Sequence, residues 1–163
     1  MRRQLGEGFE LDDDRSRIDA TAVHAYISGR SYWGRGRTMA LVEQTIAGSQ
    51  RVLGLYRHGE LVGFARAISD GVTLAYLADV YVLEPYRGRG LGLELVREMV
   101  EGGPRWPVRW MLHTADAQGL YAKLGFGEGA AAYPLMERSR APERSGRDGG
   151  VPAEAPRGSL PRP

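Results

Sequence analysis

The feature that most constrains the fold is one apolar run of twelve residues, 72–83, the longest strand candidate in the chain. The run is apolar on both faces, as expected for a central strand that is covered from both sides. Glycines at 88, 90 and 92 follow it, then a helical pattern over 91–101 and a further strand pattern over 108–114. A strand, a helix and a second strand in this order predict a parallel pair joined by a right-handed crossover. The chain is therefore expected to form an α/β protein with a mixed sheet.

The first half of the chain adds two helices and an antiparallel meander. Thr38 is a suitable N-cap for the second helix, which Gly48 ends. The dipeptides His58-Gly59 and Asp70-Gly71 predict hairpin turns, because glycine readily adopts the positive φ that such turns need. The predicted order is α-α-β-β-β-α-β-α-β, with elements over 16–27, 39–47, 51–57, 61–68, 72–83, 91–101, 108–114, 116–124 and 131–136.

Composition excludes several kinds of site. The chain has no cysteine, so a disulfide framework and thiol catalysis are excluded. It has three histidines, none paired at i, i+4, and we therefore expect no metal site. No apolar run approaches the length of a membrane span, and the residues after Met1 lack the apolar stretch of a signal peptide. We expect a cytoplasmic protein without a membrane partner.

The basic charge of the chain is concentrated at its C-terminal end. Residues 138–163 contain six arginines and three acidic residues, which gives this segment a net charge of +3. Because the formal net charge of the whole chain is +2, residues 1–137 carry a net charge of −1. The same segment has five prolines and four glycines and almost no large apolar residue, which predicts a disordered tail. Residues 1–137 are the expected folded domain, and because its charge is near zero no nucleic-acid partner is expected.

The glycine segment between strand and helix is a candidate anion site. Backbone N–H groups at a helix N-terminus point outward and favour a phosphate or diphosphate. The dinucleotide fingerprint G-x-G-x-x-G is not met, because position 93 is leucine, and the ATPase pattern G-x-x-x-x-G-K-[ST] is absent. The sequence therefore lacks the main motifs of nicotinamide-dependent enzymes and of ATPases, and both classes are disfavoured.

Two motifs in order give a specific resemblance. Arg87-Gly88-Arg89-Gly90-Leu91-Gly92 has the form [Q/R]-x-x-G-x-[G/A], and the segment from Ala117 through Tyr121 to Gly125-Phe126 follows about thirty residues later. Together they resemble the GNAT N-acetyltransferase superfamily, most strongly over 72–127. The resemblance implies a mixed sheet with an antiparallel N-terminal meander, flanking helices, and a central parallel pair that splays around acetyl-CoA.

The resemblance also implies where acetyl-CoA is bound. The pantetheine arm would lie between 80–82 and 112–114, with the N–H near Val82 facing the thioester carbonyl, and the amides of 88–93 would bind the diphosphate. Arg87 and Arg89 would add charge. The family often has an asparagine near Asp116 that contacts pantetheine; an N-cap role is the alternative for Asp116. The expected contacts are Val80, Tyr81, Val82, Arg87, Gly88, Arg89, Gly90, Leu91, Gly92, Leu93, Asp116 and Tyr121.

Two residues are predicted to be catalytic. Tyr121 matches the family tyrosine that protonates or hydrogen-bonds the departing CoA thiolate, although helix packing alone could also explain an aromatic there. Asp79 is a carboxylate inside an apolar strand, where burial is costly unless it is hydrogen-bonded. It is the candidate base, and organising backbone or loop hydrogen bonds is its alternative role. His113 could act through water or be a structural histidine.

The acceptor site is predicted at the loop between the first two helices and the strands beside it. The loop between the first two helices and nearby strands supplies the candidate acceptor residues Arg30, Tyr32, Trp33, Arg35, Arg37, Arg66 and His113. Aromatic and arginine side chains suit a small primary amine that also bears an anionic group; a solvated arginine-rich loop is equally consistent. The predicted function is N-acetylation of a small molecule. The alternatives are a CoA-binding module without turnover and an acetyltransferase for protein N-termini or lysines. A homodimer is compatible with the hydrophobic edge strands of this fold.

Overall fold

The computed structural model describes residues 1–103, 109–127 and 136. The strands are β1 (Arg2–Gly6), β2 (Phe9–Asp12), β3 (Arg51–Arg57), β4 (Glu60–Ser69), β5 (Leu74–Val82) and β6 (Arg109–Met111). The helices are α1 (Ala20–Gly29), α2 (Met39–Ala47), α3 (Leu91–Glu101) and α4 (Gln118–Ala122), with short 3-10 turns η1 (Arg15–Arg17) and η2 (Glu84–Tyr86). The six strands form one sheet in the order β1-β2-β3-β4-β5-β6, antiparallel except for the parallel pair β5–β6. The predicted mixed α/β sheet is confirmed.

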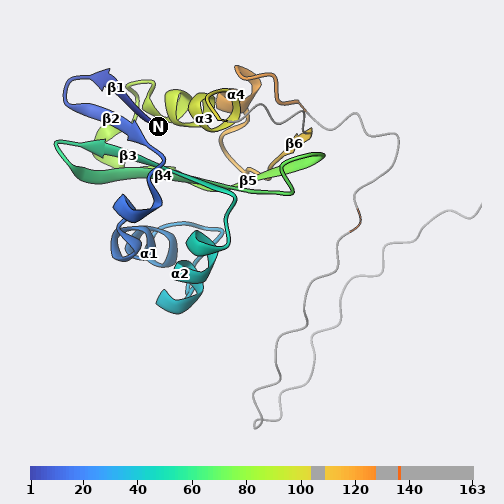
Figure 1. Ribbon diagram of the computed structural model, residues 1–163, viewed down its shortest axis with the longest axis horizontal. Helices are drawn as coiled ribbons and strands as arrows, with labels where there is room; N and C mark the ends of the chain where they lie inside the picture. Colours follow the sequence, from blue (N-terminus) through green and yellow to red (C-terminus); the bar gives the residue numbers. More distant parts are fainter. Residues whose placement is uncertain (104–108, 128–135, 137–163) are drawn as a thin grey trace, which may run out of the picture. The chain divides into compact units, whose positions relative to one another are not determined.

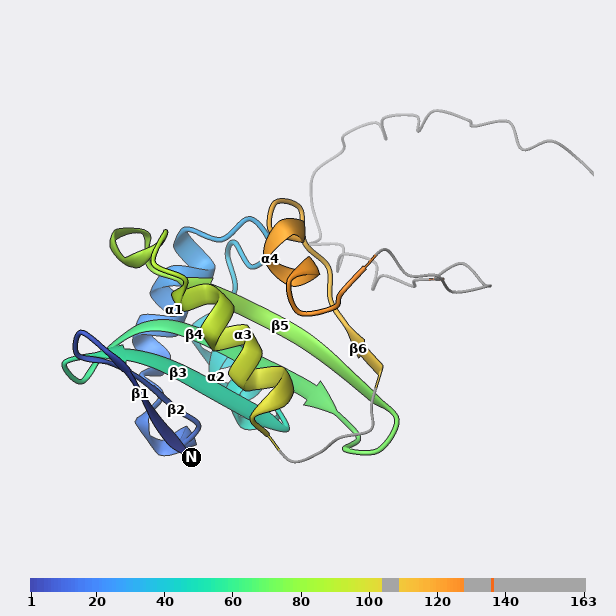
Figure 2. The ribbon, with the colours of Figure 1, turned by 90° about the horizontal axis from the view of Figure 1, so that it is seen from above.

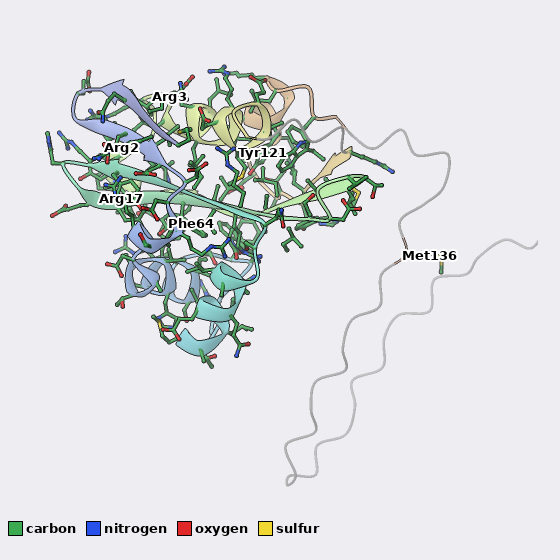
Figure 3. All side chains as sticks on the ribbon, viewed as in Figure 1. Arg2, Arg3, Arg17, Phe64, Tyr121 and Met136 are labelled. Atoms are coloured by element: carbon green, nitrogen blue, oxygen red, sulfur yellow. The ribbon has the colours of Figure 1, made fainter. Side chains whose placement is uncertain are left out.

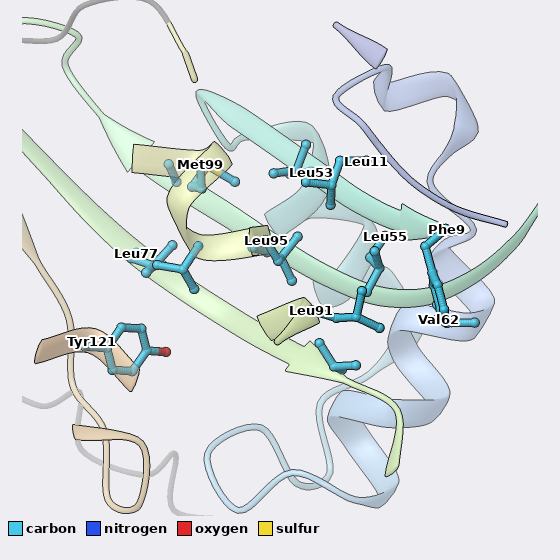
Figure 4. Close-up of a cluster of buried hydrophobic side chains, with 14 residues drawn as sticks. Phe9, Leu11, Leu53, Leu55, Val62, Leu77, Leu91, Leu95, Met99 and Tyr121 are labelled. Atoms are coloured by element: carbon cyan, nitrogen blue, oxygen red, sulfur yellow. The ribbon is translucent and has the colours of Figure 1, made fainter. Parts of the chain in front are cut away.

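The helices cover both faces of the sheet. α1 and α2 lie on one face and α3 and α4 on the other (Figure 1). Each face has its own buried cluster: Phe64 belongs to the cluster under α1 and α2, whereas Leu95 and Met99 of α3 pack on the opposite face with Tyr121 at the edge (Figures 3 and 4). β4 and β5 are therefore covered from both sides, as the apolar pattern of the central strand predicted.

Several element ends differ from the sequence prediction for local reasons. The first helix begins at Ala20 rather than at residue 16, because the Asp19 carboxylate accepts the N–H groups of Thr21 and Ala22 and so caps the helix there. Strand β5 begins at Leu74 rather than at residue 72. Here the Asp70 carboxylate accepts from the backbone N–H groups of the three residues 72–74, which holds the preceding segment in a turn. The N-cap predicted for the second helix is confirmed, since the Thr38 hydroxyl accepts from the Leu41 N–H.

The N-terminal hairpin β1–β2 is absent from the predicted order, which was wrong at this point. β1 has the sequence Arg-Arg-Gln-Leu-Gly, with no apolar alternation to reveal a strand. It forms because it pairs with β2, whose Phe9 and Leu11 are buried in the core. The hairpin turns through positive φ at Gly6, Glu7 and Gly8.

Other predictions fall on residues that the structure does not describe. The chain divides into two units, Met1–Glu128 and Gly129–Pro163, and Met136 is the one described residue of the second. The predicted strand over 131–136, apart from Met136, and the predicted tail over 138–163 lie outside the described residues. Within the described residues, no helix is long and apolar enough to cross a membrane, and no group of acidic or histidine side chains could hold a metal ion.

The N-terminal hairpin gives the fold a testable acid sensitivity. Glu10 accepts hydrogen bonds from Arg2 (2.8 Å), Arg17 (2.7 Å) and Gln4 (2.8 Å), and the contact with Arg2 is the largest cause that lowers the pKa of Glu10 to about 2. Because its folded pKa lies below its ordinary value of 4.5, Glu10 stabilises the fold fully above about pH 4.5 and loses this contribution as the pH falls toward 2. We expect Glu10→Gln to lower the urea midpoint at pH 7 and to match the wild type near pH 2.

The control for this experiment is Glu60→Gln, an exposed carboxylate on β4. Its urea midpoint should follow the wild type from pH 7 to pH 2. A gap between wild type and Glu10→Gln that stays constant across this range would contradict the role given to the Glu10 charge.

Candidate active site

The candidate site is a cleft that opens where β5 and β6 diverge. Parallel pairing joins Leu74–Tyr76 to Arg109–Met111 and stops there, although β5 continues to Val82 (Figure 2). The predicted strand over 108–114 is therefore wrong beyond Met111, because the chain leaves β5 there and is no longer a strand. A cleft of about 1140 Å³ lies along the unpaired part of β5, bordered by the glycine loop, α4 and the loop 30–38 between α1 and α2. The splayed parallel pair that the resemblance implied is present.

The glycine loop presents open backbone to this cleft. Gly88 (φ 75°) and Gly90 (φ 77°) adopt the left-handed conformation, and a Cβ at either position would meet nothing within 4 Å. Gly90 is the N-cap of α3, and no side chain of the described residues caps the first turn. These free donors at the positive end of a helix dipole fit a diphosphate.

Val82 turns its amide toward the cleft. The next residue, Leu83, donates its N–H to the carbonyl of Val62 on the β4 side (2.8 Å). Because backbone groups alternate between the two edges of a strand, the N–H and C=O of Val82 point to the opposite edge, where β6 has moved away. The Val82 N–H therefore faces the cleft, and its contact with an acyl carbonyl stays a prediction.

Arg87 ties the glycine loop to the end of β5. Its Nε donates to the Val82 carbonyl (2.8 Å), and its Nη2 donates to the hydroxyl of Tyr26 (2.6 Å) and to Glu84 (3.2 Å). Tyr26 in turn stacks on Tyr81 with ring centroids 3.9 Å apart. Arg87 therefore orders the protein around the Val82 peptide, a role that the sequence motif did not indicate. The second predicted charge, Arg89, lies 3.4 Å from Glu7 of the N-terminal hairpin.

A β-bulge places Asp79. Phe64 pairs with Tyr81 and Arg66 with Ala78, so two residues of β5, Asp79 and Val80, oppose one residue of β4. Asp79 has a φ of 51°, which aspartate tolerates better than most residues. The bulge shifts the alternation of β5, so Leu77 belongs to the cluster under α3 whereas Tyr81 belongs to the cluster under α1 and α2.

The Asp79 carboxylate is surrounded by donors. Arg66 Nε donates to it at 2.6 Å, Arg37 Nη1 donates to both of its oxygens at 2.9 Å, and the indole N–H of Trp33 donates at 3.1 Å. Its side chain is 2% exposed. The structure thus brings together one predicted catalytic residue and three predicted acceptor residues. Two guanidinium groups on one carboxylate favour the organising role for Asp79 over that of a base.

Tyr121 faces the same cleft from α4. The helix is shorter than the predicted 116–124: Ala117 is its N-cap and Gly125, with φ 81°, follows its end. Gly92 allows α3 to approach α4 closely, since a Cβ there would lie 3.2 Å from the Leu120 side chain. Burial is the main cause that raises the pKa of Tyr121 to about 12, and the charges of Tyr32 and Asp116 raise it further. The phenol is therefore protonated throughout the neutral range.

The segment 113–116 borders the cleft opposite β5. His113 Nδ1 hydrogen-bonds to the Tyr76 hydroxyl (2.8 Å), and the Ala115 N–H donates to the Tyr32 hydroxyl (2.9 Å). The alternative N-cap role of Asp116 is wrong, because Ala117 is the N-cap of α4. The Ala117 N–H donates to the Thr114 hydroxyl (3.0 Å). Asp116 is exposed and lines the cleft.

Most of the predicted site residues line this one cleft, and some lining residues were missed. Arg35 and Arg89 are predicted residues that do not line it. Tyr26, Tyr76 and Glu84 do line it but were not predicted. Tyr76 could have been found from its place on the predicted central strand, three residues before Asp79. Glu84 could have been found from its i,i+3 spacing to Arg87, whereas no sequence pattern connects Tyr26 to Arg87, which lies 61 positions away.

Comparisons with known proteins agree with this geometry. The acetyltransferase (GNAT) family matches residues 43–126. A protein of Gibberella zeae named as a candidate acetyltransferase, FG08082, is 31% identical over 136 residues, which is 71% of this chain and 76% of that protein. A crystal structure from Xanthomonas campestris pv. campestris, described as a candidate acetyltransferase of the GNAT family, is 37% identical with a TM-score of 0.74 and covers 80% of this chain and 92% of that chain. Protein SA2161 of meticillin-resistant Staphylococcus aureus, at 21% identity and a TM-score of 0.63, covers 81% of this chain and 99% of its own and shows the fold alone.

Fold, cleft and relatives together define the class of the protein, which is an acyltransferase. The chain belongs to the acetyltransferase (GNAT) family, as the two sequence motifs indicated.

Proposed function

We propose that the protein transfers an acetyl group from acetyl-CoA to the primary amine of a small molecule. The observation that carries the proposal is the convergence of three features on one cleft: the free N–H groups of the glycine loop, the outward amide of Val82 and the protonated phenol of Tyr121. Positioning, carbonyl polarisation and proton handling are the three requirements of direct acyl transfer to an amine.

Each part of the cleft has a separate task in this proposal. When bound, acetyl-CoA supplies an acetyl group activated as a thioester. The first-turn amides of α3 hold a diphosphate, and the Val82 N–H polarises an acyl carbonyl. Tyr121 keeps its proton near neutral pH and delivers it to the departing sulfur as the C–S bond breaks and the new C–N bond forms. The attacking nitrogen gives up its proton to solvent water, and the Tyr121 phenolate recovers a proton from water. Arg87 holds the Val82 carbonyl, which lies in the peptide unit next to the polarising N–H, and so restrains the backbone of Val82 before the reaction begins.

Calorimetry of acetyl-CoA binding tests the cofactor part of the proposal. We expect micromolar binding by the wild type and loss of binding in Gly90→Glu, because the new side chain would place bulk and negative charge in the open space at the α3 N-terminus. Gly59→Glu is the matched control. Gly59 also has a positive φ (88°) and open space around a Cβ, but it lies in the β3–β4 turn, away from the cleft.

Three outcomes separate the alternatives. Loss of binding in Gly90→Glu but not in Gly59→Glu would support the diphosphate site. No binding by the folded wild type would refute the proposal. Binding without acetylation of any amine would instead favour a CoA-binding module without turnover.

A further inference from the structure

The side of the cleft formed by loop 30–38 and by the segment around His113 is lined with aromatic rings. Tyr32 and Trp33 come from the loop, Tyr76 from β5 and His113 from the segment after β6. We call these four residues the aromatic wall. Tyr32 and Trp33 are 55% and 38% exposed, and their rings meet edge to face with centroids 4.9 Å apart. Large exposed rings beside a cleft mark a binding surface.

The hydroxyls of Tyr32 and Tyr76 and the indole N–H of Trp33 are engaged with the protein. The Tyr32 hydroxyl accepts from the Ala115 N–H, the Trp33 N–H donates to Asp79, and the Tyr76 hydroxyl bonds to His113. These bonds fix the orientation of the rings, while their carbon surfaces stay open to the cleft. The wall is therefore suited to flat apolar groups rather than to polar ones.

The loop that carries Tyr32 and Trp33 is itself held in place. Arg37 anchors it to Asp79, the Arg37 carbonyl bonds to His24 Nε2 (3.0 Å), and the Gly36 N–H donates to the Ser28 carbonyl (3.1 Å). A ligand that packs on the wall does not have to order the loop first, and this preorganisation lowers the entropic cost of binding.

We propose that the acceptor is a primary amine that carries an aromatic ring, and that the ring packs against Tyr32 and Trp33. This inference rests on the proposed function and names the substrate class of the same cleft. The arginines near the wall share their charge with acids: Arg37 and Arg66 with Asp79, and Arg30 and Arg87 with Glu84. Because each acid faces two guanidinium groups, a net positive charge remains near the wall and an anionic group on the acceptor is compatible with it. The exposed rings of the wall recognise the aromatic ring of the acceptor.

The test uses two matched pairs of amines that differ by one ring. 2-Phenylethylamine is compared with ethylamine, and phenylalanine with alanine, by kcat/KM for acetyl transfer and by calorimetric titration of the amine into the protein. In at least one pair we expect the ring-bearing amine to have about tenfold higher kcat/KM and tighter direct binding. Equal values in both pairs would overturn the inference.

Variants of Trp33 connect the preference to the wall. Trp33→Ala is expected to remove most of the ring preference. Trp33→Phe is expected to keep most of it, because phenylalanine retains a ring, although it loses the N–H that bonds to Asp79. Leu41→Ala, which truncates an exposed apolar side chain on α2 outside the cleft, is the control and should change nothing. An unchanged ring preference in a folded Trp33→Ala protein would refute the assigned wall.

Failure of this inference differs from failure of the proposed function. A wild type that binds acetyl-CoA but shows no ring preference refutes the acceptor class alone. A wild type that binds the ring-bearing amines tenfold more tightly in calorimetry yet does not bind acetyl-CoA supports the wall and refutes acetyl transfer.

Discussion

Replacing Asp79 by asparagine is expected to lower the free energy of unfolding by about 3 kcal/mol, because it leaves the cations of Arg37 and Arg66 beside a neutral group in a buried site. Asparagine keeps the size of the side chain and tolerates the positive φ of the bulge, so the loss of charge is the main change. Chemical denaturation at pH 7 measures the effect.

The same variant distinguishes the two roles of Asp79. If the carboxylate organises the loop, Arg66→Met in the Asp79→Asn background should recover part of the lost stability, since one uncompensated buried cation is then removed. If Asp79 is the base, Asp79→Asn should instead lose kcat by a hundredfold or more while the protein keeps its stability; a base typically contributes about 10²–10⁴-fold. A stable but inactive Asp79→Asn protein would therefore overturn the organising role.

Replacing Tyr121 by phenylalanine is expected to lower kcat by about 100-fold and to leave acetyl-CoA affinity unchanged, because the phenol acts on the leaving group and not on the diphosphate. Burial raises the pKa of Tyr121 to about 12, so the wild type should keep this proton donor well above pH 9. Steady-state kinetics with saturating acetyl-CoA, together with calorimetry, measure both quantities.

Tyr56→Phe is the matched control for Tyr121→Phe. Tyr56 is buried on β3, its pKa is raised to about 12 by burial, and its hydroxyl has no hydrogen-bond partner among the described residues. It does not line the cleft. Loss of a buried phenol hydroxyl there should leave kcat unchanged. Equal loss of kcat in the two variants, or none in Tyr121→Phe, would remove the proton-donor role from Tyr121.

The sequence by itself determined the central part of the fold and one side of the site. The strand-helix-strand crossover, the two-residue turn at His58-Gly59 and the Thr38 cap were predicted correctly, because the elements and the turns are set mainly by residues close in sequence. The same holds for the glycine loop, where Gly88 and Gly90 take the positive φ that local chemistry suggests. The turn at Asp70-Gly71 was placed correctly, but it is a four-residue connection over 70–73.

Only the tertiary structure decided the N-terminal hairpin and the roles of Asp79 and Arg87 in the cleft. β1 is a strand because it pairs with β2, and its sequence Arg-Arg-Gln-Leu-Gly has no pattern that predicts this pairing. The bulge at Asp79 depends on register with β4, which turns this carboxylate toward Arg66 and Arg37. Arg87 reaches Tyr26 across 61 positions of sequence. Pairs so far apart leave no periodic pattern in the sequence, because their geometry is set by the packing of the whole domain. The roles of Asp79 and Arg87 could therefore be assigned only from the folded structure, which shows their partners.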